Sequence, residues 1–354
     1  MREPAGESKL MAFTLSLNTN PLVNRFAEPD DLIDAIAYDI GIRDVQLTHE
    51  FVNPGWPAAT ISKFIRLFRN ALDRTGVCVK SGMTGPYGRL NHFGHPDADV
   101  RRYYVDWFKT FADISAELGA TGMGTQFAIF THRDFDDPER RARLFDVALE
   151  CWREVAEHAK AAGLTYLFWE PMSVGREFGH TIDSCRVLHN EIEAAGMAIP
   201  MKMMVDIDHG DVTSSNPADI DPYAWAEAFP NVSPIIHVKQ SSMNKGGHWP
   251  FIAAYNQDGR ITPEKFLETV RRGGGVDNEI CLELSFRERE PVDHQVVAMI
   301  RESVDYWAPF IETGRAALLP RDGQGTAPAR LTGPPRSDEA GRTQPNLGSR
   351  LPDL

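Results

Sequence analysis

Short apolar runs alternate with longer amphipathic stretches from about residue 11 to residue 314. Most of these runs are apolar throughout, which is typical of parallel strands that are buried on both faces. The pattern therefore predicts eight strands, at residues 13–17, 44–48, 77–82, 121–127, 164–170, 201–206, 235–239 and 279–285.

The stretches between the runs predict helices, most clearly over residues 137–162. Asp137 can cap this helix, Pro138 suits its first position, and Gly163 can end it. The same helical spacing of apolar residues predicts a last helix over 292–313. Eight strand–helix units predict an α/β fold, the (β/α)8 TIM barrel. A doubly wound open sheet is the alternative, and it is disfavoured because no GxGxxG follows the first strand.

The two ends of the chain differ from the part between them. Residues 315–354 are rich in Pro, Gly and Arg and poor in core-forming residues, so we expect a disordered tail. Residues 1–10 are polar, lack the apolar region of a signal peptide, and are expected to form a disordered extension. The catalytic barrel is thus predicted to span residues 11–314.

Charge and cysteine usage narrow the class of protein. The formal net charge is −13, which argues against a surface that binds nucleic acid. The four cysteines are far apart and form no CxxC pair, as expected for reduced thiols in a cytoplasmic protein. No apolar run approaches the roughly 20 residues of a membrane span.

Four consecutive predicted strands, the fifth to the eighth, carry chemically active residues near their C-terminal ends. These residues are Glu170, Asp206, His237 and Glu283. Each alone has an ordinary structural explanation, such as a helix cap, a salt bridge or a hydrogen-bonded core histidine. Together they lie where TIM barrels place their active sites. Three carboxylates and an imidazole predict a site for a divalent cation of the Mn, Mg, Co or Zn group.

Long motifs around these residues resemble a known family. The segments "SGMTGPYGRLNHFGHPDADVRRYYVDWFKTFADI", "FWEPMSVGREFGHT", "MKMMVDIDHGD" and "HVKQSSMNKGGHWPF" are similar to xylose-isomerase-like TIM barrels that epimerise or isomerise sugars. Within that family they most resemble the 3-epimerases of a phosphorylated ketotetrose that act in erythritol breakdown. The resemblance implies Glu170, Asp206, His237 and Glu283 as metal ligands, with Mn favoured, and His209 as a residue that contacts the substrate.

The resemblance also implies a mechanism. Glu170 and Glu283 would exchange a proton at C3 of the ketose through an enediolate, one on each face of the substrate. The predicted barrel agrees, because its fifth and eighth strands are three steps apart around the ring.

The phosphate group of such a substrate needs cationic or N–H donors. TIM barrels commonly bind phosphate at the loops after strands seven and eight. These loops predict Lys239, Lys245, His248 and Arg287 as substrate-binding residues. As partners the sequence predicts a small sugar phosphate and neither nucleic acid nor a membrane, and it leaves a homo-oligomer open.

Four other functions are alternatives. An aldose–ketose isomerase, or a 3-epimerase of another ketose, would use the same residues. A metal phosphoesterase like endonuclease IV would need more His and Asp ligands than this chain supplies, including a D-x-H after His237 that "HVKQSS" lacks. A non-catalytic sugar-binding barrel would have no need for two opposed glutamates.

Overall fold

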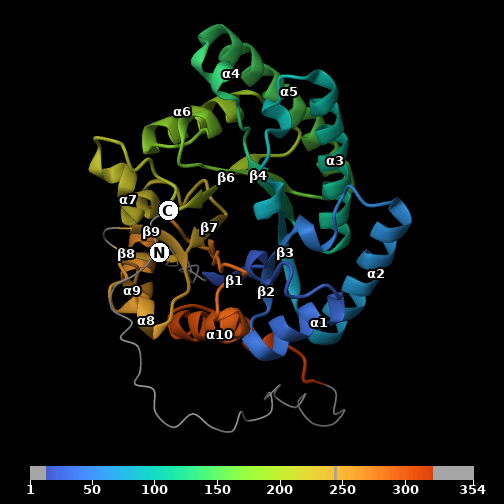
Figure 1. Ribbon diagram of the computed structural model, residues 1–354, viewed down its shortest axis with the longest axis vertical. Helices are drawn as coiled ribbons and strands as arrows, with labels where there is room; N and C mark the ends of the chain where they lie inside the picture. The colour runs from blue at the N-terminus through green and yellow to red at the C-terminus, as the bar shows by residue number, and fades with distance from the viewer. Residues whose placement is uncertain (1–12, 243–244, 322–354) are drawn as a thin grey trace, which may run out of the picture. The chain divides into compact units, whose positions relative to one another are not determined.

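The computed structural model describes residues 13–242 and 245–321. Eight parallel strands close into a barrel in the order β1-β10-β7-β6-β5-β4-β3-β2, with helices around it (Figure 1). The TIM barrel predicted from the apolar runs is confirmed. The strands are β1 (Thr14–Asn18), β2 (Asp44–Thr48), β3 (Cys78–Met83), β4 (Gly122–Gln126), β5 (Tyr166–Glu170), β6 (Met201–Asp206), β7 (Ile235–Val238) and β10 (Glu279–Leu282).

Helices connect successive barrel strands, as in other (β/α)8 folds. The α-helices are α1 (Pro29–Asp34), α2 (Ala58–Thr75), α3 (Ala98–Glu117), α4 (His132–Asp136), α5 (Pro138–Ala162), α6 (Ile182–Ala194), α7 (Pro222–Ala228), α8 (Ala253–Asn256), α9 (Pro263–Arg272) and α10 (Val296–Trp307). A π-helical segment, Ala35–Ile40, continues α1. Among the described helices, none combines the length and the apolar character that a membrane span requires.

The two helices that the sequence marked most clearly behave differently at their ends. In α5, the Asp137 carboxylate accepts hydrogen bonds from the backbone N–H groups of Glu139 and Arg140, as its capping role predicts. The last helix is shorter than predicted, since α10 spans only Val296–Trp307. Pro309 contributes to this end, because it has no backbone N–H to continue the helical hydrogen bonds, although Ala308 before it still has helical backbone.

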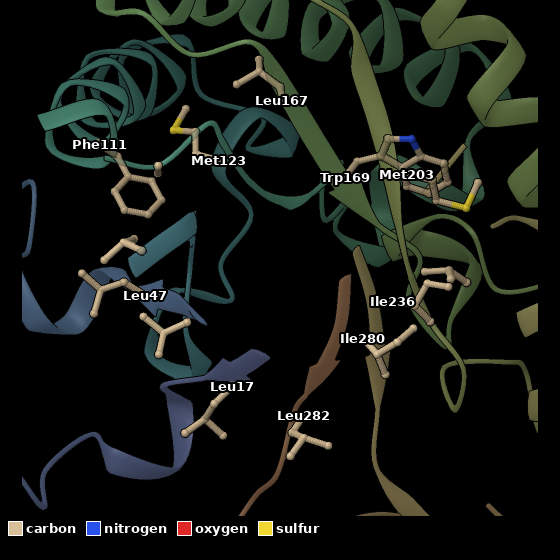
Figure 2. Packing of buried hydrophobic residues seen from close by; sticks show 14 of the residues in the cluster. Leu17, Leu47, Phe111, Met123, Leu167, Trp169, Met203, Ile236, Ile280 and Leu282 are labelled. Atoms are coloured by element: carbon tan, nitrogen blue, oxygen red, sulfur yellow. The ribbon is translucent and has the colours of Figure 1, made fainter. Parts of the chain in front are cut away.

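Alternation along the strands divides their side chains into two sets. One set packs outward against the helices and includes Leu17, Leu47, Trp169 and Ile236 (Figure 2). The other set points into the barrel, because successive side chains of a strand face opposite sides. Its apolar members form a separate interior cluster of five residues: Met83, Phe168, Met204, Ile235 and Cys281.

The segment after β7 was predicted as a loop, but it forms an antiparallel hairpin. Its two strands are β8 (Gln240–Ser242) and β9 (Lys245–Trp249). The carbonyl of His248 in β9 accepts a hydrogen bond from the backbone N–H of Ser285 (2.8 Å), which follows β10. The hairpin is therefore joined to the barrel end where the predicted site residues lie.

Contacts with the barrel continue beyond the predicted domain boundary at residue 314. The Arg315 guanidinium pairs with Asp305 (2.6 Å) and donates to the carbonyl of Gly41 (2.8 Å). The N–H of Leu319 donates to the carbonyl of Thr75 (2.8 Å). The remainder of the predicted tail, residues 322–354, and the predicted extension at residues 1–10 lie outside the described residues.

Two truncations separate these contacts from the rest of the tail. Deletion of residues 322–354 should leave the melting temperature unchanged, because the sequence of this segment has little to contribute to a core. Deletion of residues 315–354 should lower it, because the ion pair and hydrogen bonds of Arg315 and Leu319 are lost. Thermal unfolding of both variants tests this, and equal melting temperatures for the two would contradict it.

Candidate active site

The four predicted ligands come together at the C-terminal end of the barrel. Glu170 and Asp206 are the last residues of β5 and β6, His237 lies in β7, and Glu283 directly follows β10. Each stands two positions after a member of the interior cluster, so strand alternation turns its side chain into the barrel. The interior cluster thus forms the apolar floor beneath the four ligands.

The geometry of these four residues fits a divalent cation. All four are buried, and one donor atom from each lies within 4.8 Å of the others. A cation about 2.1 Å from each oxygen or nitrogen would place opposite donors roughly 4.2 Å apart. Nδ1 of His237 lies 3.3 Å from Glu170 Oε1 and 3.4 Å from Glu283 Oε2. The three oxygens and one nitrogen therefore converge at a separation suited to a metal ion.

Unsatisfied polar atoms point to the same conclusion. Among the described residues, neither Glu170 Oε1 nor His237 Nδ1 has a hydrogen-bond partner, although both are buried. Buried polar atoms without partners are rare and call for a reason. A cation bound between them would provide it.

Gln46, at the inner face of β2, fixes which nitrogen of His237 is available. The Asn18 amide donates to the Gln46 Oε1 atom (2.7 Å), which identifies that atom as the side-chain oxygen. An amide oxygen can only accept, so Nε2 of His237 must donate to it (2.8 Å). The proton of a neutral His237 then lies on Nε2, and Nδ1 presents its lone pair to the carboxylates. Histidine ligands of metals typically have such an orienting partner. Nothing in the spacing of the sequence singled out Gln46.

Lys239 occupies a different position from the one predicted. It was expected to contact the substrate's phosphate, but its side chain is fully buried among the carboxylates. Its ammonium group contacts Asp206 and donates to Glu283 (2.9 Å) and to Nε2 of His248 (2.7 Å). Lys239 is thus a buried countercharge for two of the candidate ligands.

Titration shifts reflect the excess of negative charge in this cluster. Burial acts to lower the pKa of His237 and of Lys239, but the neighbouring carboxylates outweigh burial and raise both pKa values. Burial acts to raise the pKa of Glu283, but Lys239 and His237 outweigh it and lower that pKa well below its usual range. The cluster therefore favours positive charge.

A cavity of about 420 Å³ opens above the cluster and is lined by Glu170, Glu283, His209 and His248, among others. Nδ1 of His209 donates to the carbonyl of Pro171 (3.0 Å), and its Nε2 lies 3.3 Å from Asp206 Oδ2. The predicted substrate-contacting residues His209 and His248 thus lie at the cavity wall. The cavity is large enough for a small sugar phosphate.

Asp208, two residues after the end of β6, anchors the β8–β9 hairpin. Its carboxylate pairs with Arg260 (2.5 Å) and accepts from the backbone N–H of Gly247 (3.0 Å). The bond to Asp208 holds the hairpin, and with it His248, over the cavity.

The remaining predicted phosphate ligands lie elsewhere. Lys245 begins β9, and its side chain lies outside the described residues. Arg287 lines a neighbouring cavity of about 520 Å³ together with Arg25 and Arg289. The structure therefore does not bring Arg287 to the wall of the cavity that holds the carboxylates.

A rigid loop after β3 forms another part of the cavity wall through Thr84, Gly85 and Arg89. The backbone N–H of Gly85 donates to Nδ1 of His49 (3.1 Å), and a side chain at Gly85 would collide with the Glu50 carboxylate. The phosphate ligands predicted from the sequence all lie after strands seven and eight, so this loop was not among them.

A TIM barrel with a buried cluster suited to a cation at the C-terminal ends of its strands is typical of sugar epimerases and isomerases, and the comparisons support this class. Residues 35–308 match the xylose isomerase-like TIM barrel family, and the chain belongs to that family. The resemblance inferred from the motifs is confirmed.

A curated relative is more specific. The chain is 68% identical over 308 residues to the D-erythrulose 1-phosphate 3-epimerase of Brucella abortus (strain 2308), covering 87% of this chain and 99% of the relative.

Solved structures share the fold at low sequence identity. A putative xylose isomerase from Rhodospirillum rubrum ATCC 11170 is 23% identical, with a TM-score of 0.74, over 84% of this chain and 99% of that one. A D-psicose 3-epimerase from Clostridium cellulolyticum H10 is 12% identical, with a TM-score of 0.60, at the same coverage.

The loop after β3 contains a buried histidine that should make stability depend on pH. Burial, reinforced by the nearby His49, lowers the pKa of His92 from 6.5 to about 3. Between these values the unfolded chain binds a proton that the folded chain excludes. Stability from His92 is therefore fully present above pH 6.5 and is lost as the pH falls toward 3, by up to about 1.4 kcal/mol per pH unit.

His92→Phe should flatten this pH dependence, because it keeps an aromatic ring against Tyr104 and Phe108 and removes the titrating group. Denaturant unfolding at a series of pH values measures the effect. His132→Phe, at an exposed position of α4, is the control. Parallel pH profiles for His92→Phe and the parent protein would refute the assignment.

Proposed function

We propose that this protein is a metal-dependent D-erythrulose 1-phosphate 3-epimerase, which interconverts L- and D-erythrulose 1-phosphate. The observation that carries the proposal is 68% identity over nearly the whole length of a relative with that activity. The site supports it, because two glutamates and a cluster suited to a cation line one cavity of appropriate size.

Glu170, Asp206, His237 and Glu283 would hold the divalent cation, and we favour Mn among the ions that suit oxygen and imidazole ligands. Asp206, His209 and His248 form a second group with ligand spacing that shares Asp206. We assign the ion to the first group, because all four of its members are buried. When bound, the cation supplies positive charge that stabilises the oxyanion of a deprotonated ketose.

Glu170 and Glu283 are suited to move the proton at C3. They follow strands three steps apart in the ring, β5 and β10, so they reach the cavity from different sides. One carboxylate removes the C3 proton to give an enediolate, and the other returns a proton to the opposite face. The two glutamates exchange roles when the other epimer is bound. Inversion at C3 follows without any change at the phosphate.

Neighbouring residues hold these groups in place. Lys239 orients Glu283 through its 2.9 Å hydrogen bond, and Gln46 orients His237. His209 and His248 lie at the cavity wall, where they can donate to substrate hydroxyls. Arg287 and Lys245 remain predictions from sequence as substrate-binding residues. The cytoplasmic location and a homo-oligomer also remain predictions from sequence.

Metal binding should be measurable without turnover. Mn²⁺ at roughly 100 times its dissociation constant should stabilise the folded protein by about 2.7 kcal/mol, which raises the melting temperature. Asp206→Asn should abolish this increase, whereas Asp211→Asn, in a turn with Thr213, should keep it. Chelation should abolish epimerase activity and Mn²⁺ should restore it. Full activity in protein that elemental analysis finds free of metal would disprove the assignment.

Isotope exchange separates epimerisation from the alternative reactions. In deuterated water the enzyme should place deuterium at C3 of the ketose phosphate and release no phosphate. Exchange at C1 would indicate an aldose–ketose isomerase instead, and released phosphate would indicate a phosphoesterase.

Glutamine variants test the two proton carriers. Glu170→Gln and Glu283→Gln should each slow epimerisation by at least ~10²–10⁴-fold, because each removes one general acid–base group. Glu227→Gln, at an exposed ion pair with Arg272, is the matched control and should retain activity. If both site variants bind metal and epimerise at the parent rate, the two-glutamate mechanism is wrong.

A further inference from the structure

The active-site cavity has an unusual charge for a site that takes a phosphorylated substrate. Its wall includes the carboxylates of Glu170, Glu283 and Asp208. A phosphate monoester adds close to two further negative charges at neutral pH. Binding therefore requires a cationic side chain close to the position of the phosphate. The proposed metal ion cannot fill this role, because it is needed at the reacting carbons.

Arg89 is the one arginine or lysine among the described residues that line this cavity. The other nearby cations are committed elsewhere. Lys239 is fully buried against Asp206 and Glu283, and Arg260 pairs with Asp208. Arg89 is about half exposed, with a side-chain accessibility of 49%, so its guanidinium can reach a ligand in the cavity.

The contacts of Arg89 leave part of its guanidinium for an anion. Its Nε and Nη2 groups donate to Oε2 of the buried Glu177, the former at 3.1 Å. Nη1 of Arg89 has no partner among the described contacts. Arg176 also pairs with Glu177, through Oε1 (2.9 Å). Two guanidinium groups thus share one carboxylate, which leaves one net positive charge beside the cavity.

The backbone around this charge is held firmly on both sides. The loop before Arg89 is fixed by the bonds of Gly85 to His49 and of the Tyr87 N–H to Glu50 (3.2 Å). The loop after it is fixed by the Asn91 amide, which donates to the carbonyl of Ile129 (2.7 Å). A cation held in place before binding loses little freedom when it takes up an anion.

The loop after β4 joins this arrangement to the loop after β5. The N–H of Phe130 donates to the carbonyl of Arg176 (2.9 Å). Together with the bond from Asn91 to Ile129, this contact ties the loops after β3, β4 and β5 into one unit that carries the Arg89–Glu177–Arg176 cluster.

We propose that Arg89 binds the phosphate group of the substrate, with Glu177 as the residue that positions it. The inference rests on the proposed epimerase function and specifies where that substrate lies. The phosphate is placed on the side of the cavity formed by the loops after β3 and β5, rather than at the β8–β9 hairpin or in the neighbouring cavity that Arg287 lines. A guanidinium suits this role, because it can form two parallel hydrogen bonds to phosphate oxygens.

The test compares phosphorylated and unphosphorylated erythrulose, with deuterium exchange at C3 as the common readout. Arg89→Ala should raise KM for erythrulose 1-phosphate by roughly 10- to 100-fold, as expected for loss of hydrogen bonds to a charged group. It should leave exchange of unphosphorylated erythrulose unchanged. Arg89→Lys, which keeps the charge and the side-chain bulk, should recover part of the loss. Arg102→Ala is the matched control, because Arg102 also pairs with a glutamate and is also 49% exposed.

A binding measurement makes the outcome independent of turnover. Inorganic phosphate should raise the melting temperature of the parent protein and of Arg102→Ala, and this increase should be lost in Arg89→Ala. If the parent epimerises neither ketose, the proposed function fails, and the phosphate-dependent melting shift still tests Arg89.

Three results would overturn the assignment of Arg89. The first is an equal loss with both ketoses, which indicates a structural role. The second is a phosphate-induced melting shift that persists in Arg89→Ala. The third is a loss confined to the phosphorylated substrate in Arg287→Ala but not in Arg89→Ala, which would place the phosphate at the neighbouring cavity.

Discussion

Three carboxylates buried within a few ångströms of one another can remain ionised together if positive charge lies among them. This constraint accounts for most of the arrangement at the mouth of the barrel. The ammonium group of Lys239 neutralises part of the charge at Asp206 and Glu283. His237 faces two glutamates with one nitrogen and is held by Gln46 through the other. The cation that the site is suited to bind supplies the remaining charge.

The barrel and its ligand cluster could be predicted from sequence because both depend on local patterns. Apolar runs mark buried parallel strands, and a residue at the end of such a run lies at the mouth of the barrel. Alternation then determines which side chains face inward. Glu170, Asp206, His237 and Glu283 satisfied both conditions, and the structure brings all four together.

The parts that the sequence did not reveal depend on contacts between distant segments. Gln46 lies 191 residues from His237, the histidine that it orients, and a glutamine within a strand carries no signal of that role. Lys239 looked like a phosphate ligand, because its burial between two carboxylates becomes visible only once β6, β7 and β10 are adjacent. The role of Asp208 also depends on a distant residue, because its partner Arg260 lies beyond the hairpin in the sequence.

The joined loops after β3, β4 and β5 bear on how relatives of this protein diverge. Arg89, Glu177 and Arg176 come from two loops, and a third loop between them bonds to both through Ile129 and Phe130. A change in the length of any one loop would disturb the other two. Gain or loss of a charged recognition group at this side of the barrel therefore requires coordinated change in three segments.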